Sequence, residues 1–191
     1  MLPVSTPTKV GYYTDDLILT YPAHHRFVSA TGWNLENVQY QRSNNYGYLT
    51  SIEFEPDANA IGLVGDSFVE ASMLREDQRL AAQLSARIHN RTIYPFGGPG
   101  SSLLDYAERI RFAYQRFGIR RFVVVLENRD IKQSLCGSAN NHGPCLEPTT
   151  LAPMKTLRET PSLAKRLLRQ SALAEYLFSQ QKLRRRGLFR H

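Results

Sequence analysis

The sequence predicts a three-layer α/β/α fold built around a parallel sheet. Three short apolar runs, Ile61–Val64, Thr92–Phe96 and Phe122–Leu126, alternate with segments of helical period. The third run has no polar alternation and is rich in β-branched residues, which is typical of a strand buried on both faces. Because strands and helices alternate at close spacing, we expect right-handed crossovers and a doubly wound α/β architecture.

The chain divides into three predicted parts. Residues 1–59 are rich in Tyr, Asn, Thr and Pro and show little periodicity, so we expect a loop-rich segment that packs on the domain. Residues 60–150 form the α/β core, and residues 151–191 form a basic helical C-terminal arm. A chain of 191 residues can bury enough surface to fold without a disulfide or a metal.

Two helices are expected between the predicted strands. The first is indicated by an apolar stripe at Leu80, Ala81, Leu84 and Ile88. The second is indicated by a longer stripe over residues 103–117, which Gly118 ends. Ser102 and Asp105 have the spacing of a capping box at the start of this second helix.

The net charge of +7 belongs to the C-terminal arm. Residues 151–191 hold ten bases and two acids, so the remainder of the chain carries a net charge of −1. A neutral body excludes a nucleic-acid-binding face on the domain. The Arg184–Arg186 run is typical of a solvated helix end, and the alternative is peripheral contact with an anionic membrane or polysaccharide. No signal peptide or membrane-spanning run is visible in the sequence.

Residues suited to acyl-transfer chemistry follow each of the three strands. Gly65, Asp66 and Ser67 follow the first strand, where a tight turn exposes a serine hydroxyl and a backbone N–H. Gly97–Gly100 follows the second strand and offers a backbone N–H to an oxyanion, and Asn128 follows the third and offers its amide. Each feature alone is typical of an ordinary turn. Because parallel strands end at one edge, we expect the three to converge.

This arrangement resembles the SGNH, or GDSL-type, serine hydrolase family. The resemblance implies a flavodoxin-like sheet, with Ser67 as nucleophile, Gly65 and Asp66 in support, and Gly100 and Asn128 completing the oxyanion hole. An element before the first strand, with Asn44, Gly47 and Tyr48 in it, is similar to members that act on cell-envelope sugars. The resemblance therefore implies O-acyl, above all O-acetyl, esters of carbohydrate as substrates, and neither a cofactor nor a metal.

Two departures from the family pattern affect the expected mechanism. The third block lacks its glycine, and the final Asp-x-x-His block, which supplies the general base, is missing because no Asp follows Asp130. We expect either that the chain stops short of a longer protein's last blocks or that it is a degenerate relative. His142 is a candidate substitute base, although a solvated loop histidine is the more ordinary interpretation. His24 and His25 lack further ligands for a zinc site.

Cys136 and Cys145 flank a loop that can close easily, and a disulfide between them is favoured over two free thiols. A disulfide indicates an oxidising compartment such as the periplasm or cell envelope.

The sequence thus predicts a serine ester hydrolase whose partner is a small-molecule or glycan ester. An acyltransferase that uses the same acyl-enzyme remains open, and so does a catalytically inactive glycan-binding module. A flavodoxin-like nucleotide binder is disfavoured because the loop after the first strand lacks a phosphate-binding glycine-rich run.

Overall fold

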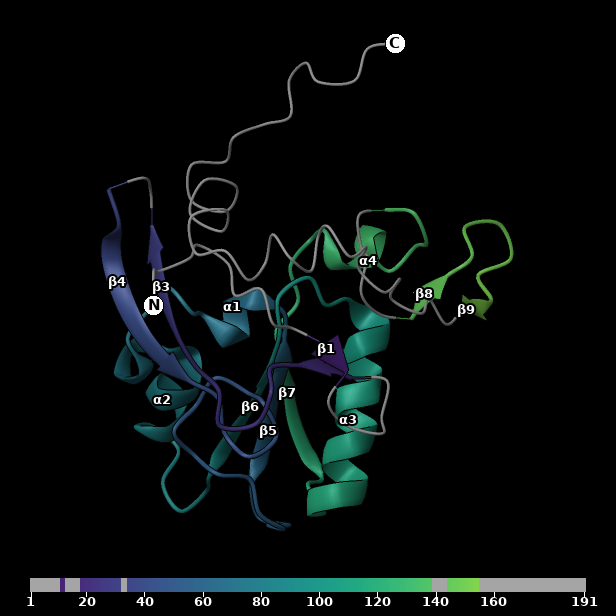
Figure 1. Cartoon of the computed structure of the whole chain (residues 1–191). Helices are drawn as coiled ribbons and strands as arrows, with labels where there is room; N and C mark the ends of the chain where they lie inside the picture. Colours follow the sequence, from purple (N-terminus) through teal and green to yellow (C-terminus); the bar gives the residue numbers. More distant parts are fainter. Residues whose placement is uncertain (1–10, 13–17, 32–33, 139–143, 155–191) are drawn as a thin grey trace.

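The computed structural model describes residues 11–12, 18–31, 34–138 and 144–154, and its centre is a parallel sheet (Figure 1). Strand β5 (Ile61–Gly65) lies between β6 (Ile93–Gly97) and β7 (Arg121–Val124), and both neighbours are parallel to it. The α/β class and the parallel sheet predicted from the three apolar runs are therefore confirmed.

The two crossovers lie on opposite sides of the sheet in Figure 1. The first contains α1 (Ser67–Glu70), the 3₁₀ helix η1 (Glu76–Gln78) and α2 (Leu80–Ser85), and the second contains α3 (Leu103–Phe117). Helix α2 ends before the predicted Ile88. Helix α3 begins at the predicted capping box, where the Ser102 backbone N–H donates to Asp105 Oδ2 at 2.8 Å. It ends at Gly118, whose φ of +73° favours glycine.

Side chains that alternate along β5 enter two separate core clusters. Val64 joins the larger cluster, which includes Tyr48, Phe54, Phe96 and Phe117 and receives residues of α3. The smaller cluster contains residues of β5, β6, α1 and α2, namely Ile61, Leu63, Val69, Ala81 and Ile93. Burial on both faces holds the central strand fixed, and with it the loop that follows at its carboxyl end.

The prediction that the third strand is buried on both faces is wrong. Strand β7 is an edge strand among the described residues, and it ends at Val124 rather than Leu126. Val123 and Val124 are each 40% exposed, whereas Phe122 packs against the larger cluster. An unbroken apolar run does not distinguish a central strand from an edge strand, because both positions tolerate β-branched residues.

The N-terminal segment contains more regular structure than the loop-rich prediction suggested. Strands β1 (Gly11–Tyr12) and β2 (Leu19–Thr20) pair with each other, and β3 (Arg26–Thr31) and β4 (Glu36–Arg42) form an antiparallel hairpin. After β7 come α4 (Asp130–Gln133), β8 (Cys145–Leu146) and β9 (Pro153–Met154).

Asn44 holds together the turn that joins the hairpin to the core. It is 1% exposed, and its Oδ1 accepts hydrogen bonds from the backbone N–H groups of Tyr46 and Tyr48, both at 3.0 Å. Its Nδ2 donates to the Ile52 carbonyl at 3.0 Å. Gly47, with φ +80°, lies so close to the Tyr21 carbonyl that a Cβ would overlap it. The Asn and Gly that carried the family resemblance therefore have a structural role here.

Replacing Asn44 with Ala should lower the free energy of unfolding by about 2–4 kcal/mol, because one buried and two half-buried backbone groups lose their partner. Urea denaturation measures the change. Asn59→Ala removes an exposed amide that donates to the Asn90 carbonyl and serves as the control, with an expected loss under about 1 kcal/mol. Equal losses in the two variants would contradict this role for Asn44.

Candidate functional site

Ser67 begins α1 immediately after the central strand. Gly65 is the last residue of β5, and Asp66 is the N-cap, whose Oδ1 accepts a hydrogen bond from the Phe68 N–H at 2.9 Å. The helix ends after one turn at Ala71, which has a left-handed conformation with φ +45°. Ser67 is exposed, so its hydroxyl faces solvent at the carboxyl edge of the sheet.

The glycines after β6 differ in what they do. A Cβ on Gly97 would overlap the backbone nitrogen of Glu70, and a Cβ on Gly98 would overlap the guanidinium of Arg109. These two glycines therefore permit α1 and Arg109 to pack against the end of β6. Gly100 is exposed and has φ +70°, in a turn where the Ser101 hydroxyl donates to the Gly98 carbonyl at 2.8 Å. Within the block, Gly100 is thus the glycine that faces solvent.

Asn128 lies on a turn that Asp130 closes. The Glu127 N–H donates to Asp130 Oδ2 at 2.9 Å, and the Asp130 N–H donates to the Glu127 carbonyl at 3.1 Å. The hydroxyl of Tyr106, on α3, donates to the same Oδ2 at 3.1 Å. Asp130 is 1% exposed whereas Asn128 is exposed, so a buried carboxylate fixes a turn that presents an amide to solvent.

The strand register brings these three segments to one edge of the sheet. Gly65 is paired with Gly97, Val64 is paired with Val124, and the Val125 N–H donates to the Val64 carbonyl at 2.9 Å. Among the described residues, no hydrogen bond joins the Ser67 side chain to Gly100, Asn128 or any other group.

The described histidines lie away from Ser67. His24 Nδ1 is 2.8 Å from an Arg42 nitrogen, and the His25 ring stacks on Phe27 in the hairpin, with ring centroids 6.1 Å apart. His89 precedes β6 at the opposite edge of the sheet. His142 lies outside the described residues, and so does the arm from residue 155 onward. The part of the chain that the structure describes therefore supplies no histidine base to Ser67.

A buried charged cluster beneath the site was not predicted from the sequence. Glu70, on α1, is 4% exposed, and both of its carboxylate oxygens accept from the Tyr21 hydroxyl at 3.1 Å. Burial raises the pKa of Glu70 to about 7, although the Tyr21 hydrogen bond and the positive charges of Arg79 and Arg109 oppose that rise.

The sequence could have identified Arg109 as a buried charge, because it lies three residues after Tyr106 and four before Ala113, on the apolar face of α3. Nothing in the sequence marks Glu70 as buried, since a single acidic residue in a short helix is ordinary.

Acidic groups surround the N-cap of α1. Burial is the largest cause that raises the pKa of Asp66 above its usual value, and the nearby carboxylates of Asp130 and Glu127 raise it further. The hydrogen bond from the Phe68 N–H works in the opposite direction. Glu127 is itself paired with Arg129, whose Nε lies 2.6 Å from its Oε1, so the acidic groups near Ser67 are balanced in part.

The structure joins Cys136 and Cys145 in a disulfide with a Cα–Cα distance of 5.0 Å, which agrees with the pairing favoured from the sequence. Beside it, the Cys136 N–H donates to the Leu146 carbonyl at 2.8 Å. The Ser134 hydroxyl donates to the Asp130 carbonyl at 2.7 Å and accepts from the Leu103 N–H at 3.2 Å. The bridge thus closes the segment that follows the Asn128 turn.

Comparisons with known proteins find no match to this chain among family models, curated proteins or solved structures. Within the described residues, no group of three or more His, Cys, Asp or Glu side chains is arranged to hold a metal ion. No helix in the same residues is both long enough and apolar enough to span a bilayer.

The free energy of unfolding should rise as the pH is lowered from about 8 to about 5. Glu70 titrates near 7 in the folded protein and near 4.5 when unfolded, so the folded state binds more protons in this range. Glu70→Gln should flatten this dependence in urea denaturation measured at several pH values, whereas the exposed Glu36→Gln should not. A wild-type slope that persists in Glu70→Gln would contradict the assignment.

Thiol titration of the unreduced, denatured protein should detect no free thiol, and two should appear after reduction, because Cys136 and Cys145 are bonded. Two thiols found without a reductant would rule out the disulfide in solution.

Proposed function

We propose that this chain is a serine ester hydrolase of the SGNH type that acts on O-acyl, above all O-acetyl, esters of carbohydrate. The carrying observation is the exposed Ser67 at the first turn after the central parallel strand, with the Gly100 and Asn128 turns following the two neighbouring strands at the same edge. The helices on opposite sides of the sheet support the three-layer, flavodoxin-like form of this fold.

In the proposed reaction, Ser67 Oγ attacks the acyl carbon, and its proton passes to solvent water or to the candidate substitute base His142. The tetrahedral oxyanion accepts hydrogen bonds from the N–H groups of Ser67 and Gly100 and from the Asn128 amide. Collapse breaks the ester bond, and the sugar oxygen leaves with the proton. Water then hydrolyses the acyl-enzyme, whereas a sugar hydroxyl as acceptor makes the same site an acyltransferase. Loss of one oxyanion donor typically lowers kcat by about 10²–10³-fold.

A second candidate function is an inactive glycan-binding module that uses the same edge of the sheet. One observation favours it: none of the described histidines contacts Ser67. A serine hydroxyl without a base is a weak nucleophile at neutral pH, and general-base catalysis contributes about 10²–10⁴-fold.

A location in the periplasm or cell envelope goes with both candidate functions. The disulfide supports it, because such bonds persist in oxidising compartments.

A fluorophosphonate probe tests the nucleophile, because it forms a covalent bond with an activated serine. We expect slow labelling of the peptide that contains Ser67, together with weak hydrolysis of an aryl acetate, both abolished in Ser67→Ala. Ser85→Ala, at the end of α2, is the matched control and should react like the wild type. Hydrolysis that survives Ser67→Ala would overturn the proposal, and failure of Ser67 to react at all would favour the binding module.

His142→Ala tests the substitute base in the same assays. We expect its labelling rate to equal that of the wild type, as for a solvated loop histidine. A fall of about 10²-fold or more would instead identify His142 as the base.

A further inference from the structure

The outer face of the β3–β4 hairpin presents two arginines and a tyrosine to solvent. The antiparallel register pairs Arg26 with Arg42 and Val28 with Tyr40. The intervening pair, Phe27 and Gln41, is buried. Because side chains alternate across a strand, Arg26, Arg42 and Tyr40 share the opposite face, and all three are exposed.

Arg26 and Arg42 form a like-charge pair that the described residues balance only in part. Like charges directly opposite each other on paired strands repel. Arg42 lies 3.8 Å from a Glu53 oxygen and also contacts His24, whereas Arg26 has no ion-pair partner among the described residues. An anion that bridges the two guanidinium groups would relieve this repulsion, and a carboxylate fits their planar forks.

Tyr40 lies two residue pairs along the hairpin from these arginines, on the same face. It is 84% exposed, more than any other large apolar or aromatic side chain in the described part of the chain. Residues two apart on a strand are separated by roughly 7 Å, which long arginine side chains can span. A bare aromatic ring with a polar tip suits the apolar face of a sugar ring, whose hydroxyl groups point outward from its edge.

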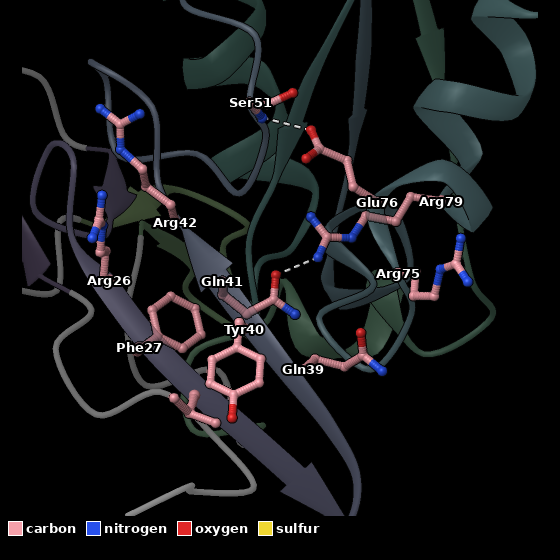
Figure 2. Close-up of a pocket in the computed structure, with 11 residues that line it drawn as sticks. Arg26, Phe27, Gln39, Tyr40, Gln41, Arg42, Ser51, Arg75, Glu76 and Arg79 are labelled. Carbon is pink, nitrogen blue, oxygen red and sulfur yellow. Dashed lines mark hydrogen bonds between the residues drawn. The ribbon is translucent and has the colours of Figure 1, made fainter. Parts of the chain in front are cut away.

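A groove of about 540 Å³ is lined by residues from both faces of this hairpin, Arg26, Arg42 and Tyr40 among them, and by Arg75, Glu76 and Arg79 (Figure 2). The charged side chains of the segment 75–79 that line the groove already have partners within the protein. Arg75 pairs with Asp77 at 2.6 Å, and Glu76 accepts from the Ser51 N–H and from the Thr50 hydroxyl. The buried Arg79 donates to the Gln41 side chain and, at 2.9 Å, to the Leu49 carbonyl.

Among the described residues at the groove, Arg26 is therefore the arginine without an ion-pair partner, and Arg42, opposite it, has only Glu53 at 3.8 Å. The volume is in the range of sites that take small ligands.

We infer that this groove binds an acidic carbohydrate, with a sugar carboxylate on Arg26 and Arg42 and a ring stacked on Tyr40. The inference deepens the proposed function by naming the class of glycan, and it rests on that function where it connects the groove to Ser67. The connection is structural, because Ser29 Oγ and Gln41 Nε2 donate to the Ser72 carbonyl at 3.3 and 2.6 Å. Ser72 follows α1 closely, so the hairpin is fixed to the segment that begins with Ser67.

Binding is tested with the full chain carrying Ser67→Ala, so that turnover plays no part. The probes are polygalacturonate, neutral dextran, and poly-L-glutamate, which is anionic but has no sugar ring. Isothermal titration calorimetry at about 0.15 M salt should show a preference for polygalacturonate over both of the other polymers. Arg26→Gln and Tyr40→Ala should each weaken binding by about tenfold or more.

Arg120→Gln and Tyr114→Ala are matched controls on exposed residues, one just after α3 and one on it, and they should leave the affinity unchanged. A separate readout follows from the repulsion between the two arginines: Arg26→Gln should raise the melting temperature of the ligand-free protein. That rise also shows that the variant folds.

Three outcomes would overturn the inference. They are absence of polygalacturonate binding, equal binding of poly-L-glutamate, and binding that ignores Arg26→Gln and Tyr40→Ala but is lost when Arg184–Arg186 is neutralised. The proposed function fails by a different measurement, namely the absence of Ser67-dependent labelling. Polygalacturonate binding without that labelling would leave the groove intact and favour an inactive module.

Discussion

The buried guanidinium of Arg109 joins the parts of the molecule that make up the candidate site. It projects from α3 and donates to the Gly65 carbonyl, at the end of the central strand, at 3.0 Å. It also donates to the Leu19 carbonyl in the N-terminal segment at 3.5 Å, and it occupies the space that Gly98 leaves open after β6. One side chain thus fixes the strand end before Ser67, the glycine turn and the N-terminal segment relative to α3.

The N-terminal segment therefore helps to hold the residues around Ser67 in place. Tyr21 reaches the buried carboxylate of Glu70 on α1, and the positive charges of Arg79 and Arg109 act on the same group. A buried carboxylate is stable only when hydrogen bonds and opposite charges replace its lost hydration. The first turn after the central strand is therefore held from below by a polar network as well as by the apolar contacts of Val69.

The sequence predicted the parts of the fold that follow from periodicity and local capping. The apolar runs located β5 and β6, and the pairing of Ser102 with Asp105 located the start of α3. The β3–β4 hairpin was missed because its buried face carries polar residues. Ser29 and Gln41 are buried by hydrogen bonds to the Ser72 carbonyl, which breaks the hydrophobic alternation that identifies a strand.

In the candidate site, too, only features with a local sequence pattern could be predicted. Ser67, Gly100 and Asn128 could be proposed from the sequence because each follows a recognisable strand. The contacts that hold their turns could not, since they join residues far apart in the chain. Asp130 and Tyr106 are 24 residues apart, and Arg109 and Gly65 are 44 apart. The glycine block predicted one oxyanion donor, Gly100, but it did not reveal that Gly97 and Gly98 leave room for α1 and Arg109.

The charged groups differ between the two proposed sites, the edge of the sheet near Ser67 and the surface of the β3–β4 hairpin. Asp66, Asp130 and Glu127 lie near Ser67, but Arg129 pairs with Glu127 at 2.6 Å and the Arg109 guanidinium donates to the Gly65 carbonyl, so acids and bases both act on this edge. The Arg26 and Arg42 pair, on the separate hairpin surface, would hold the acid group of a glycan there while an ester elsewhere on the chain approaches Ser67.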